Sequence, residues 1–333
     1  MINNKSILIT GGTGSFGKEM LKTLLKKFKA KKIVVFSRDE LKQSELEQKY
    51  PSSKYKNIRY FIGDVRDYER LKSAFNGIDI VIHAAALKQV TTAEYNPIEC
   101  IKTNINGAEN VIKAAFECDV KKVVALSTDK AVNPINLYGA TKLVSEKLFI
   151  SANNIYGDKQ TRFSVVRYGN VIGSRGSVVD VFKKLINQNV PCFPITDKRM
   201  TRFWMTLAQS VELVLNSIKL MQGGETYIPK IPSIKITDLA KAMSSSKKIK
   251  IIGIRPGEKI NELLCSSSAA HLTLEFDNHY VVMPSTSKNI SYNSYKKNKV
   301  GKIGKPVISE FEYTSEKNEK FLSVQDIKKS INN

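Results

Sequence analysis

Cysteine is scarce in this chain, and its four cysteines show no spacing typical of metal ligands. They stand at positions 100, 118, 192 and 265, and three have apolar neighbours, which predicts free thiols in a reducing compartment. Long apolar runs are also missing: no stretch approaches the roughly 20 residues that span a bilayer, and the opening MINNKSILITGG lacks the apolar core and cleavage site of a leader peptide. We therefore expect a cytoplasmic protein without a membrane partner.

Acidic residues are few. The chain has 31 Asp and Glu against 53 Lys and Arg, a formal net charge of +22 over 333 residues. Such a charge would suit a nucleic-acid binder, but the lysines are spread along the chain, with no basic stripe studded with aromatic residues and no recognition-helix signature. We therefore expect no nucleic-acid partner and attribute the excess charge to a surface that attracts anionic ligands.

Short runs of Val and Ile alternate with longer helical patterns in the first half of the chain. Strands are predicted at 6–12, 32–37, 58–64, 78–86, 121–128 and 162–170, and helices at 15–29, 39–49, 67–75, 94–117 and 136–154. Nearly continuous Val and Ile indicate strands covered on both faces, as in a parallel sheet. The pattern predicts an α/β fold, a Rossmann-type doubly wound parallel sheet.

The rhythm changes after residue 172, where Pro- and Gly-bearing loops separate helical patches at 177–188, 207–221 and 236–243. We predict an NADP-binding Rossmann domain over 1–172, to which later segments can return, and a smaller C-terminal substrate-binding lobe over 173–284. From 285 to 333 Ser, Asn and Lys dominate, which predicts a basic, polar and loosely ordered extension. Within it, FLSVQDIKKSI could form a closing short helix.

A glycine-rich turn follows the first predicted strand. ITGGTGSFGKEM places Gly11, Gly14 and Gly17 between that strand and a helix, in the pattern G-x-x-G-x-x-G. Glycines permit a tight turn and let the backbone reach a pyrophosphate, while the N–H groups and dipole of the following helix favour the anion. Because the strand before it and the helix after it are both present, the turn predicts dinucleotide binding.

The end of the second strand, VVFSRDELK, bears on the choice of cofactor. A chain that reads NAD carries an acid here to hold the ribose hydroxyls, but Ser37 and Arg38 stand there instead, with Lys42 one turn on. Arginine binds a 2′-phosphate bidentately, so we predict NADP, with Asp39 as a helix N-cap. Asp64, after the third strand, would meet the adenine amino group or cap a turn.

Tyr138 and Lys142 form a Y-x-x-x-K pattern behind a strand that ends at Thr128. On a helix this spacing places both side chains on one face. The Lys ammonium is there expected to lower the pKa of the Tyr phenol and make it a usable base. The residues after the strand, Asp129 and Lys130, are either a second acid–base pair or a loop salt bridge.

These residues together resemble the extended short-chain dehydrogenase/reductase family over roughly residues 1–285, including the family's mid-helix Asn at position 104. Five further segments are similar to one branch of that family, the inverting UDP-N-acetylglucosamine 4,6-dehydratases of pseudaminic acid biosynthesis. They are STDKAVNPINLYGATK, SRDELKQSE, RYGNVIGSRGSVV, ITDKRMTRFW and IGIRPGEK. The resemblance implies a hydro-lyase that acts on a UDP-sugar with NADP as cofactor.

The resemblance also assigns roles around the fifth strand. Tyr138, with Thr128 and Lys142, would remove the proton of the carbon-4 hydroxyl while NADP oxidises that carbon. The ketone acidifies the hydrogen on carbon 5; we expect Lys130 to remove it and Asp129 to protonate the departing carbon-6 hydroxyl. The two roles could be exchanged because each group perturbs the other's titration. As a base, Lys130 needs a pKa lowered by burial or by a neighbouring cation.

Binding residues are carried over from the same motifs. The dinucleotide is expected to contact Gly11, Thr13, Gly14, Ser15, Phe16, Gly17, Ser37, Arg38, Asp39, Glu40, Lys42, Asp64, Val65, Ala84, Lys88, Thr103, Tyr138, Lys142, Val171 and Arg175. The UDP-sugar is expected to contact Lys88, Asn170, Arg202, Arg255 and Glu258, although any of these arginines could instead tie the two lobes together. No metal site is predicted. Related enzymes are oligomers, so a homodimer or hexamer is expected.

Three short segments depart from the pattern of the resembled branch. KQVTT (88–92) stands for KHVP, EKINE (258–262) for EKLHE, and SVVD, ending at residue 180, for SVVP. We expect all three changes at the substrate mouth, so the exact sugar and the outcome at carbon 5 stay open. The rival interpretations are a UDP-sugar 4-epimerase, a non-catalytic NADP-binding protein and a basic nucleic-acid binder.

Overall fold

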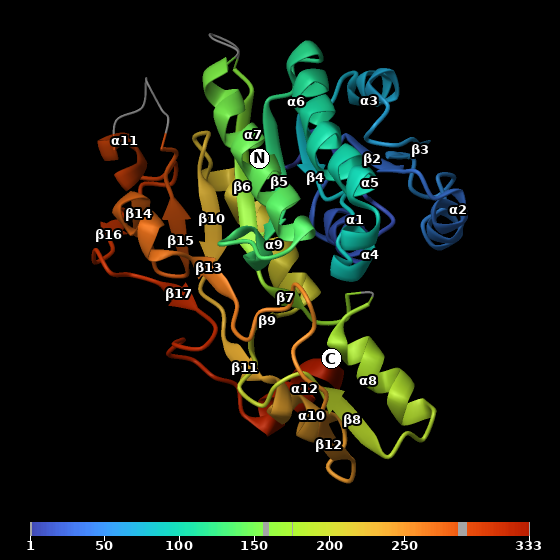
Figure 1. Cartoon of the computed structure of the whole chain (residues 1–333). Helices are drawn as coiled ribbons and strands as arrows, with labels where there is room; N and C mark the ends of the chain where they lie inside the picture. Colours follow the sequence, from blue (N-terminus) through green and yellow to red (C-terminus); the bar gives the residue numbers. More distant parts are fainter. Residues whose placement is uncertain (1, 156–159, 175, 286–291, 333) are drawn as a thin grey trace.

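A large, mostly parallel sheet organises this computed structural model, which describes residues 2–155, 160–174, 176–285 and 292–332. Its strand order is β16-β14-β15-β10-β6-β5-β4-β1-β2-β3 (Figure 1). The parallel strands are β1 (Ser6–Thr10), β2 (Lys32–Ser37), β3 (Ile58–Ile62), β4 (Ile80–His83), β5 (Lys122–Thr128), β6 (Arg162–Tyr168) and β10 (Thr226–Pro229). The antiparallel edge adds β14 (Thr273–Glu275), β15 (His279–Val282) and β16 (Lys305–Pro306). The predicted Rossmann-type fold is confirmed.

Helices cover both faces of the sheet because alternate side chains of each strand form two separate cores. On one face Ile7, Ile9 and Val35 pack with α1 (Ser15–Lys27), α2 (Glu40–Lys49) and α9 (Leu207–Leu220). On the other face Leu8 and Val34 pack with α3 (Tyr68–Phe75), α6 (Gly107–Glu117) and α7 (Leu137–Ile155). Burial on both faces explains the continuous Val and Ile runs.

The helix predicted over 94–117 is wrong as a single element. It divides into α4 (Val90–Tyr95), α5 (Pro97–Ile101), a π-helical turn at Lys102–Asn106, and α6. Asn96 leaves the helical conformation because it precedes Pro97. Within the π turn, Asn104 donates from Nδ2 to the Leu87 carbonyl and accepts from the Leu87 N–H, both at 2.9 Å. The break therefore ties this segment to the loop after β4.

A second lobe lies beyond the carboxyl ends of β5 and β6 (Figure 1). It contains β7 (Asn170–Val171), β9 (Thr201–Met205) and β11 (Ser233–Lys235) in one small sheet and β8 (Cys192–Ile195) with β12 (Lys248–Ile251) in another. The helices α8 (Val178–Asn187), α10 (Ile236–Met243) and α12 (Val324–Asn332) share its core with Phe193 and Trp204. This lobe closes over the edge of the sheet where βα turns carry the polar motifs.

The loosely ordered extension predicted from residue 285 is wrong for the described part of that segment. It forms α11 (Tyr292–Lys296), β16, β17 (Tyr313–Thr314), which pairs with β13 (Leu263–Cys265), and the closing helix α12, whose prediction is confirmed. Tyr295, Tyr313 and Ile327 are buried. The aromatic and aliphatic residues are too sparse for a periodic signal, yet each enters an existing core.

The structure bears on what the sequence predicts for its cysteines and its apolar segments. All four cysteines are free thiols, with Cys100 and Cys265 buried. Across the described ranges, no helix combines the length and the apolar character needed to cross a bilayer.

Candidate active site

A cavity of about 940 Å³ separates the two lobes at the carboxyl ends of the central strands. Most of the predicted site residues line it: Gly11, Thr13, Gly14, Ser15, Phe16, Gly17, Ser37, Arg38, Asp39, Lys42, Asp64, Val65, Ala84, Lys88, Thr103, Thr128, Asp129, Lys130, Tyr138, Lys142, Asn170, Val171, Arg202, Arg255 and Glu258. Glu40 does not; it is exposed at the start of α2, so its predicted cofactor contact is not supported. Arg175 lies outside the described residues.

Buried polar atoms without hydrogen-bond partners gather around this cavity. Among the described residues, they include Thr103 Oγ1, Ser127 Oγ, Asp129 Oδ2, Asn170 Oδ1 and Glu262 Oε2, and all five residues line the cavity. A buried polar atom without a partner costs roughly 1–3 kcal/mol, so such atoms are rare unless a ligand satisfies them. The cavity is therefore built for a polar ligand.

The turn after β1 has the shape of a phosphate cradle. Gly11 has φ +65°, and a Cβ there would lie 2.9 Å from the Ala85 nitrogen; a Cβ on Gly17 would lie 2.5 Å from the Gly12 backbone. Both positions therefore require glycine. Gly14 precedes α1 without a side-chain cap, which leaves this helix end open toward the cavity for an anion. These residues fit a dinucleotide.

Cationic and hydroxyl side chains lie where the second strand ends. Ser37 Oγ and Thr13 Oγ1 are 2.7 Å apart, and Arg38, whose side chain is 53% exposed, lies 3.6 Å from Asp64. Asp39 accepts a hydrogen bond from the Lys42 N–H at 3.0 Å, so the predicted N-cap is confirmed. At this corner the long, exposed Arg38 side chain follows the strand, and the neighbouring Asp39 carboxylate is engaged by Lys42.

Asp64 caps a turn. It accepts from the Arg66 N–H at 3.0 Å and from Arg66 Nη2 at 2.7 Å. Burial raises the pKa of Asp64, but its bonds with Arg66 and the nearby Arg38 outweigh burial and lower that pKa overall. The sequence left open whether Asp64 contacts the adenine amino group or caps a turn. In the structure it caps a turn, and its carboxylate also lines the cavity.

The acid and base candidates lie in a short 3-10 turn, Asp129–Ala131, directly after β5. Thr128 Oγ1 donates to Asp129 Oδ1 at 2.9 Å and accepts from the Lys130 N–H at 3.3 Å. The turn packs on α7, where a Cβ on Gly139 would lie 2.1 Å from the Lys130 carbonyl oxygen. The helix that carries Tyr138 and Lys142 therefore fixes the position of the Lys130 backbone relative to the end of β5.

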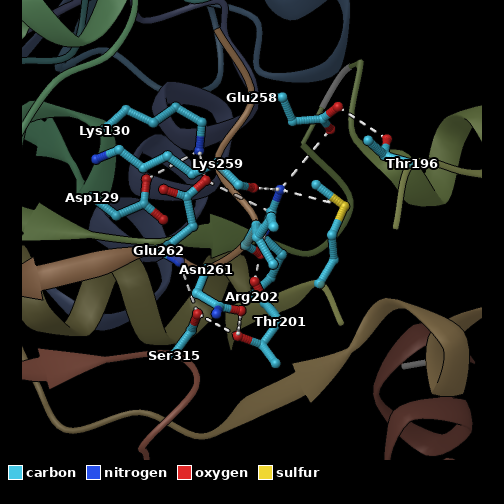
Figure 2. A network of polar contacts seen from close by, with 12 residues as sticks. Asp129, Lys130, Thr196, Thr201, Arg202, Glu258, Lys259, Asn261, Glu262 and Ser315 are labelled. Carbon is cyan, nitrogen blue, oxygen red and sulfur yellow. Dashed lines mark hydrogen bonds and ion pairs between the residues drawn. The ribbon is translucent and has the colours of Figure 1, made fainter. Parts of the chain in front are cut away.

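Lys130 lies between two buried carboxylates. Its Nζ donates to Glu262 Oε1 at 2.8 Å and to Asp129 Oδ1 at 3.2 Å, and the carboxylate side chains are only 2% and 1% exposed. Figure 2 shows Lys130 and Asp129 at one end of a polar network in which Arg202 lies between Glu262 and Glu258. The salt bridge between Asp129 and Lys130 that was considered from the sequence is present, and it includes Glu262 from a distant segment as a third group.

Burial lowers the pKa of Lys130, but Asp129 and Glu262 outweigh burial and raise that pKa overall. The expectation of a lowered lysine pKa is therefore wrong for the chain alone. Burial and the Glu262 charge raise the pKa of Asp129. In Glu262, burial is outweighed by Lys130 and Arg202, and its pKa is lowered. These directions favour an ammonium on Lys130 and an ionised Glu262 carboxylate, and they make Asp129 a weaker acid than a free aspartic acid.

Tyr138 and Lys142 are both buried beside this turn. Burial raises the pKa of Tyr138 to about 12, against the opposing effects of the Lys130 charge and a hydrogen bond with Thr128. Burial lowers the pKa of Lys142 to about 8. The expectation that Lys142 lowers the tyrosine pKa is wrong for the chain alone, since the opposing cation is Lys130.

The candidate substrate arginines differ in their surroundings. Arg202 donates from Nη1 to the carbonyls of Thr201 and Ile260 at 2.7 and 2.8 Å, and from Nη2 to the Lys259 carbonyl at 2.9 Å. It therefore ties β9 to the 255–262 segment within the second lobe, and these bonds do not form the link between the two lobes that was considered from the sequence. Arg255, 64% exposed, pairs with Glu258 at 2.9 Å and remains accessible from the cavity.

The three departures from the family pattern lie in different places. Gln89 lines the cavity, and Asp180 accepts from the Gly176 N–H at 2.8 Å at the start of α8. Asn261 accepts from Thr201 Oγ1 at 2.8 Å and points away from Lys130 toward Ser315 (Figure 2). The expectation that Asn261 changes the substrate mouth is wrong because the chain alternates there, and its neighbour Glu262 faces the cavity.

Glu262 is the residue that sequence reasoning missed. It comes from the second lobe, and 132 positions separate it from Lys130. The segment EKINE contains two acids, and only the first was assigned to the site. The second acid of EKINE, next to the departure at Asn261, is the signal that could have identified it.

The contact between Gly139 and Lys130 gives a stability prediction. Gly139→Ala places a methyl group against the Lys130 carbonyl, so we expect the free energy of unfolding to fall by roughly 1–3 kcal/mol and the Lys130 turn to shift. Urea unfolding measures the first effect. As a control, Lys147→Ala on the exposed face of α7 should change stability by less than about 0.5 kcal/mol; equal stability of the Gly139→Ala variant and the natural protein would refute the close contact.

A glycine cradle beside a Thr–Tyr–Lys set at the ends of parallel strands defines an extended short-chain dehydrogenase/reductase. Residues 7–284 match the family model described as polysaccharide biosynthesis protein. The chain belongs to this family.

The similar proteins refine this assignment. The UDP-N-acetylglucosamine 4,6-dehydratase (inverting) of Campylobacter jejuni is 56% identical over 332 residues, which cover 100% of this chain and 98% of that protein. The structure of Pen from Bacillus thuringiensis has a TM-score of 0.88 at 39% identity and covers 99% of this chain and 97% of that one. The resemblance to the inverting dehydratase branch is thereby confirmed.

A more distant structure shares the fold. DesIV of Streptomyces venezuelae, a dTDP-glucose 4,6-dehydratase with NAD and TYD bound, has a TM-score of 0.67 at 20% identity, covering 77% of this chain and 86% of that one. The present chain accordingly shares the overall fold of that structure.

Proposed function

We propose that the protein is an NADP-dependent UDP-N-acetylglucosamine 4,6-dehydratase that inverts carbon 5. The reaction releases one water and forms a UDP-4-keto-6-deoxy-N-acetylhexosamine, the first step of pseudaminic acid-type nonulosonate synthesis for surface glycans. The observation that carries the proposal is the set of Asp129, Lys130 and Glu262 facing the same cavity as Tyr138 and Lys142. Full-length similarity to an enzyme of this name supports the substrate.

The first step needs a base at the carbon-4 hydroxyl. Tyr138 takes that proton as carbon 4 becomes a ketone, with Thr128 and Lys142 fixing the phenol. When bound, the dinucleotide supplies the hydride acceptor for carbon 4 and the hydride donor for carbon 6. Tyr138 needs a lower pKa than the chain alone gives it, and the Lys130 ammonium, which lowers that pKa, is the protein group that acts in this direction.

The second step breaks two bonds of the sugar. Lys130 takes the hydrogen of carbon 5 as a proton, the electron pair forms the carbon 5–carbon 6 double bond, and the carbon-6 hydroxyl leaves with a proton from Asp129 as water. The pKa of Asp129 is raised, which is the direction that a proton donor requires. Arg255, Asn170 and Lys88 are proposed to hold the UDP-sugar, and Arg202 to support the segment that carries Glu258.

A UDP-sugar 4-epimerase is the second candidate, because curated UDP-glucose 4-epimerases also match this chain, at 42% identity. Epimerisation uses Thr128, Tyr138 and Lys142 but has no step that requires the buried acid and base groups at Asp129 and Lys130. That set therefore favours dehydration.

The corner at Arg38 supports NADP as the cofactor. We predict that Arg38→Ala weakens NADP binding by roughly 10- to 100-fold, the range of one charge-assisted hydrogen bond, and leaves NAD binding unchanged. Titration calorimetry with both dinucleotides measures this. Arg59→Ala, which removes an arginine that donates only to the carbonyls of Lys56 and Ile58 among the described contacts, is the control. Equal losses for NADP and NAD would contradict a 2′-phosphate contact.

Assembly and location complete the proposal. Exposed apolar side chains on neighbouring helices, among them Tyr95, Ile98 and Val144, support a homo-oligomer, a dimer or hexamer. Free thiols support a cytoplasmic protein. Light scattering of the purified chain would test the oligomer, and a monomer at micromolar concentration would contradict it.

Mass spectrometry of the product made from UDP-N-acetylglucosamine tests the proposed function. Loss of one water is expected. A product of unchanged mass with a changed sugar configuration would identify the epimerase instead, and unchanged substrate with tightly bound cofactor would identify a non-catalytic binder.

A further inference from the structure

Glu262 has features that neither the fold nor the assigned catalytic groups explain. Its side chain is 2% exposed, its Oε2 atom has no hydrogen-bond partner among the described residues, and it lines the cavity. Its Oε1 atom accepts from Lys130 Nζ at 2.8 Å. Burying a carboxylate costs free energy unless the group is paired and hydrogen-bonded. One oxygen of this carboxylate has no such bond within the described part of the chain, which suggests a role in the chemistry of the cavity.

We propose that Glu262 is a positioning and proton-accepting residue for Lys130: its carboxylate takes the ammonium proton and so produces the neutral amine that removes the hydrogen of carbon 5. This inference rests on the proposed function, because it supplies the base that the elimination needs. In the transfer the Nζ–H bond breaks and a bond from hydrogen to Glu262 Oε1 forms, along the existing hydrogen bond.

The transfer resolves a conflict in the site. Lys130 donates hydrogen bonds to two carboxylates and is held as an ammonium, a state that cannot accept a proton. Moving the proton along one hydrogen bond converts the ion pair of Lys130 and Glu262 into a neutral pair. Losing the proton to solvent would instead leave the Glu262 carboxylate charged and without its cation, which a buried site tolerates less well. No proton has to leave the site for solvent.

The same geometry lets the acid be reset. After elimination Lys130 carries the hydrogen of carbon 5, Glu262 carries the displaced proton, and Asp129 has lost its proton to water. Lys130 Nζ also donates to Asp129 Oδ1 at 3.2 Å, so a proton can pass from Glu262 through Nζ to Asp129. Thus the three groups form one relay with Nζ at its centre, and the proton that carbon 5 gains when hydride is added to carbon 6 is balanced by the proton that Tyr138 took from the carbon-4 hydroxyl.

Other charged groups around the relay are fixed in place. Arg202 Nε lies 3.7 Å from Glu262 Oε1, Lys259 donates from Nζ to the Val132 carbonyl at 2.6 Å, and Tyr138 faces Lys130 from α7. The Arg202 and Lys259 cations favour an ionised Glu262 at rest. They keep the proton on Lys130 until the sugar is bound.

Glu262→Gln tests the proposal, because the amide still accepts a hydrogen bond from Lys130 but cannot take its proton. We expect the kcat for dehydration to fall by about 100-fold or more, while KM changes little. The lysine must then release its proton to solvent, so the remaining rate should rise about tenfold per pH unit up to the lysine pKa. The natural enzyme should lack this slope, and Glu212→Gln, on the exposed face of α9, should behave like it.

A merely structural Glu262 would give a different result. A uniform loss without a pH slope, or full activity of Glu262→Gln, would overturn the proposal. If Glu262→Gln does not fold, Glu262→Asp keeps a carboxylate farther from Nζ; a slower enzyme without the pH slope is then expected, and an unchanged rate would overturn the proposal.

A measurement without substrate separates this inference from the proposed function. Nitrogen NMR of the lysine amines, with Lys130→Arg to assign the signal, follows the titration of Nζ directly. Removing one of two adjacent carboxylates should lower the pKa of Lys130 in Glu262→Gln. An unchanged titration would refute the coupling between the two groups, whereas absence of dehydrated product from the natural enzyme would refute the proposed function and leave the titration result standing.

Discussion

Replacing Lys130 by alanine or by arginine is expected to abolish release of water from UDP-N-acetylglucosamine while leaving dinucleotide binding intact. The expected loss is about 100- to 10,000-fold, the range of one positioned general base. Lys130→Ala removes the amine altogether. Lys130→Arg keeps a cation between Asp129 and Glu262 but introduces a guanidinium that does not lose its proton in proteins.

The two variants together separate chemistry from folding. Lys130→Ala removes the cation that lies between the buried side chains of Asp129 and Glu262. Removing one partner of a buried ion pair costs about 3–5 kcal/mol, so this variant will be less stable. Lys130→Arg preserves the charge balance and should unfold close to the natural protein in urea. If Lys130→Arg retained near-full dehydratase activity, Lys130 would not be the base at carbon 5.

Tyr138→Phe is expected to stop the reaction before any water is lost, with a fall in kcat of about 100- to 10,000-fold. The ring keeps its packing against Ala93 and Cys100, so only the hydroxyl that takes the carbon-4 proton is removed. Product formation, measured by chromatography of the nucleotide sugars, tests this expectation.

Tyr60→Phe is the matched control for Tyr138→Phe. The Tyr60 hydroxyl donates to the Tyr50 carbonyl at 2.9 Å, far along the sheet from the cavity, so its loss should lower stability by about 1 kcal/mol and leave kcat unchanged. Near-normal turnover by Tyr138→Phe would show that another group, such as the neighbouring Thr128, takes the carbon-4 proton.

Local sequence signals were sufficient for the parts of the site that lie within one βα unit. The turn at Gly11 and Gly17, and the spacing of Tyr138 and Lys142, are each set by a strand followed by a helix, and the structure forms both. The N-cap at Asp39 depends on three consecutive residues, so it was equally predictable.

Features that depend on contacts between distant segments could not be read in this way. Glu262 meets Lys130 only because the second lobe closes over the sheet. Asp129 and Glu262 together reverse the pKa direction expected for Lys130 from burial alone. Asn261 was expected at the substrate mouth, but backbone alternation turns it toward Thr201. Apart from its closing helix, order in the C-terminal extension was not predicted, because Tyr295 and Tyr313 enter cores formed by other segments.

The most direct test of the dehydration chemistry is NMR of the product formed from UDP-N-acetylglucosamine in deuterated water. If Lys130 and its carboxylate neighbours remove the hydrogen of carbon 5 and a proton later returns to the opposite face, carbon 5 should carry deuterium in the inverted configuration, and carbon 6 should be a methyl group. A product that keeps its original hydrogen at carbon 5, or that retains the hydroxyl on carbon 6, would contradict the acid–base role assigned to the residues after β5.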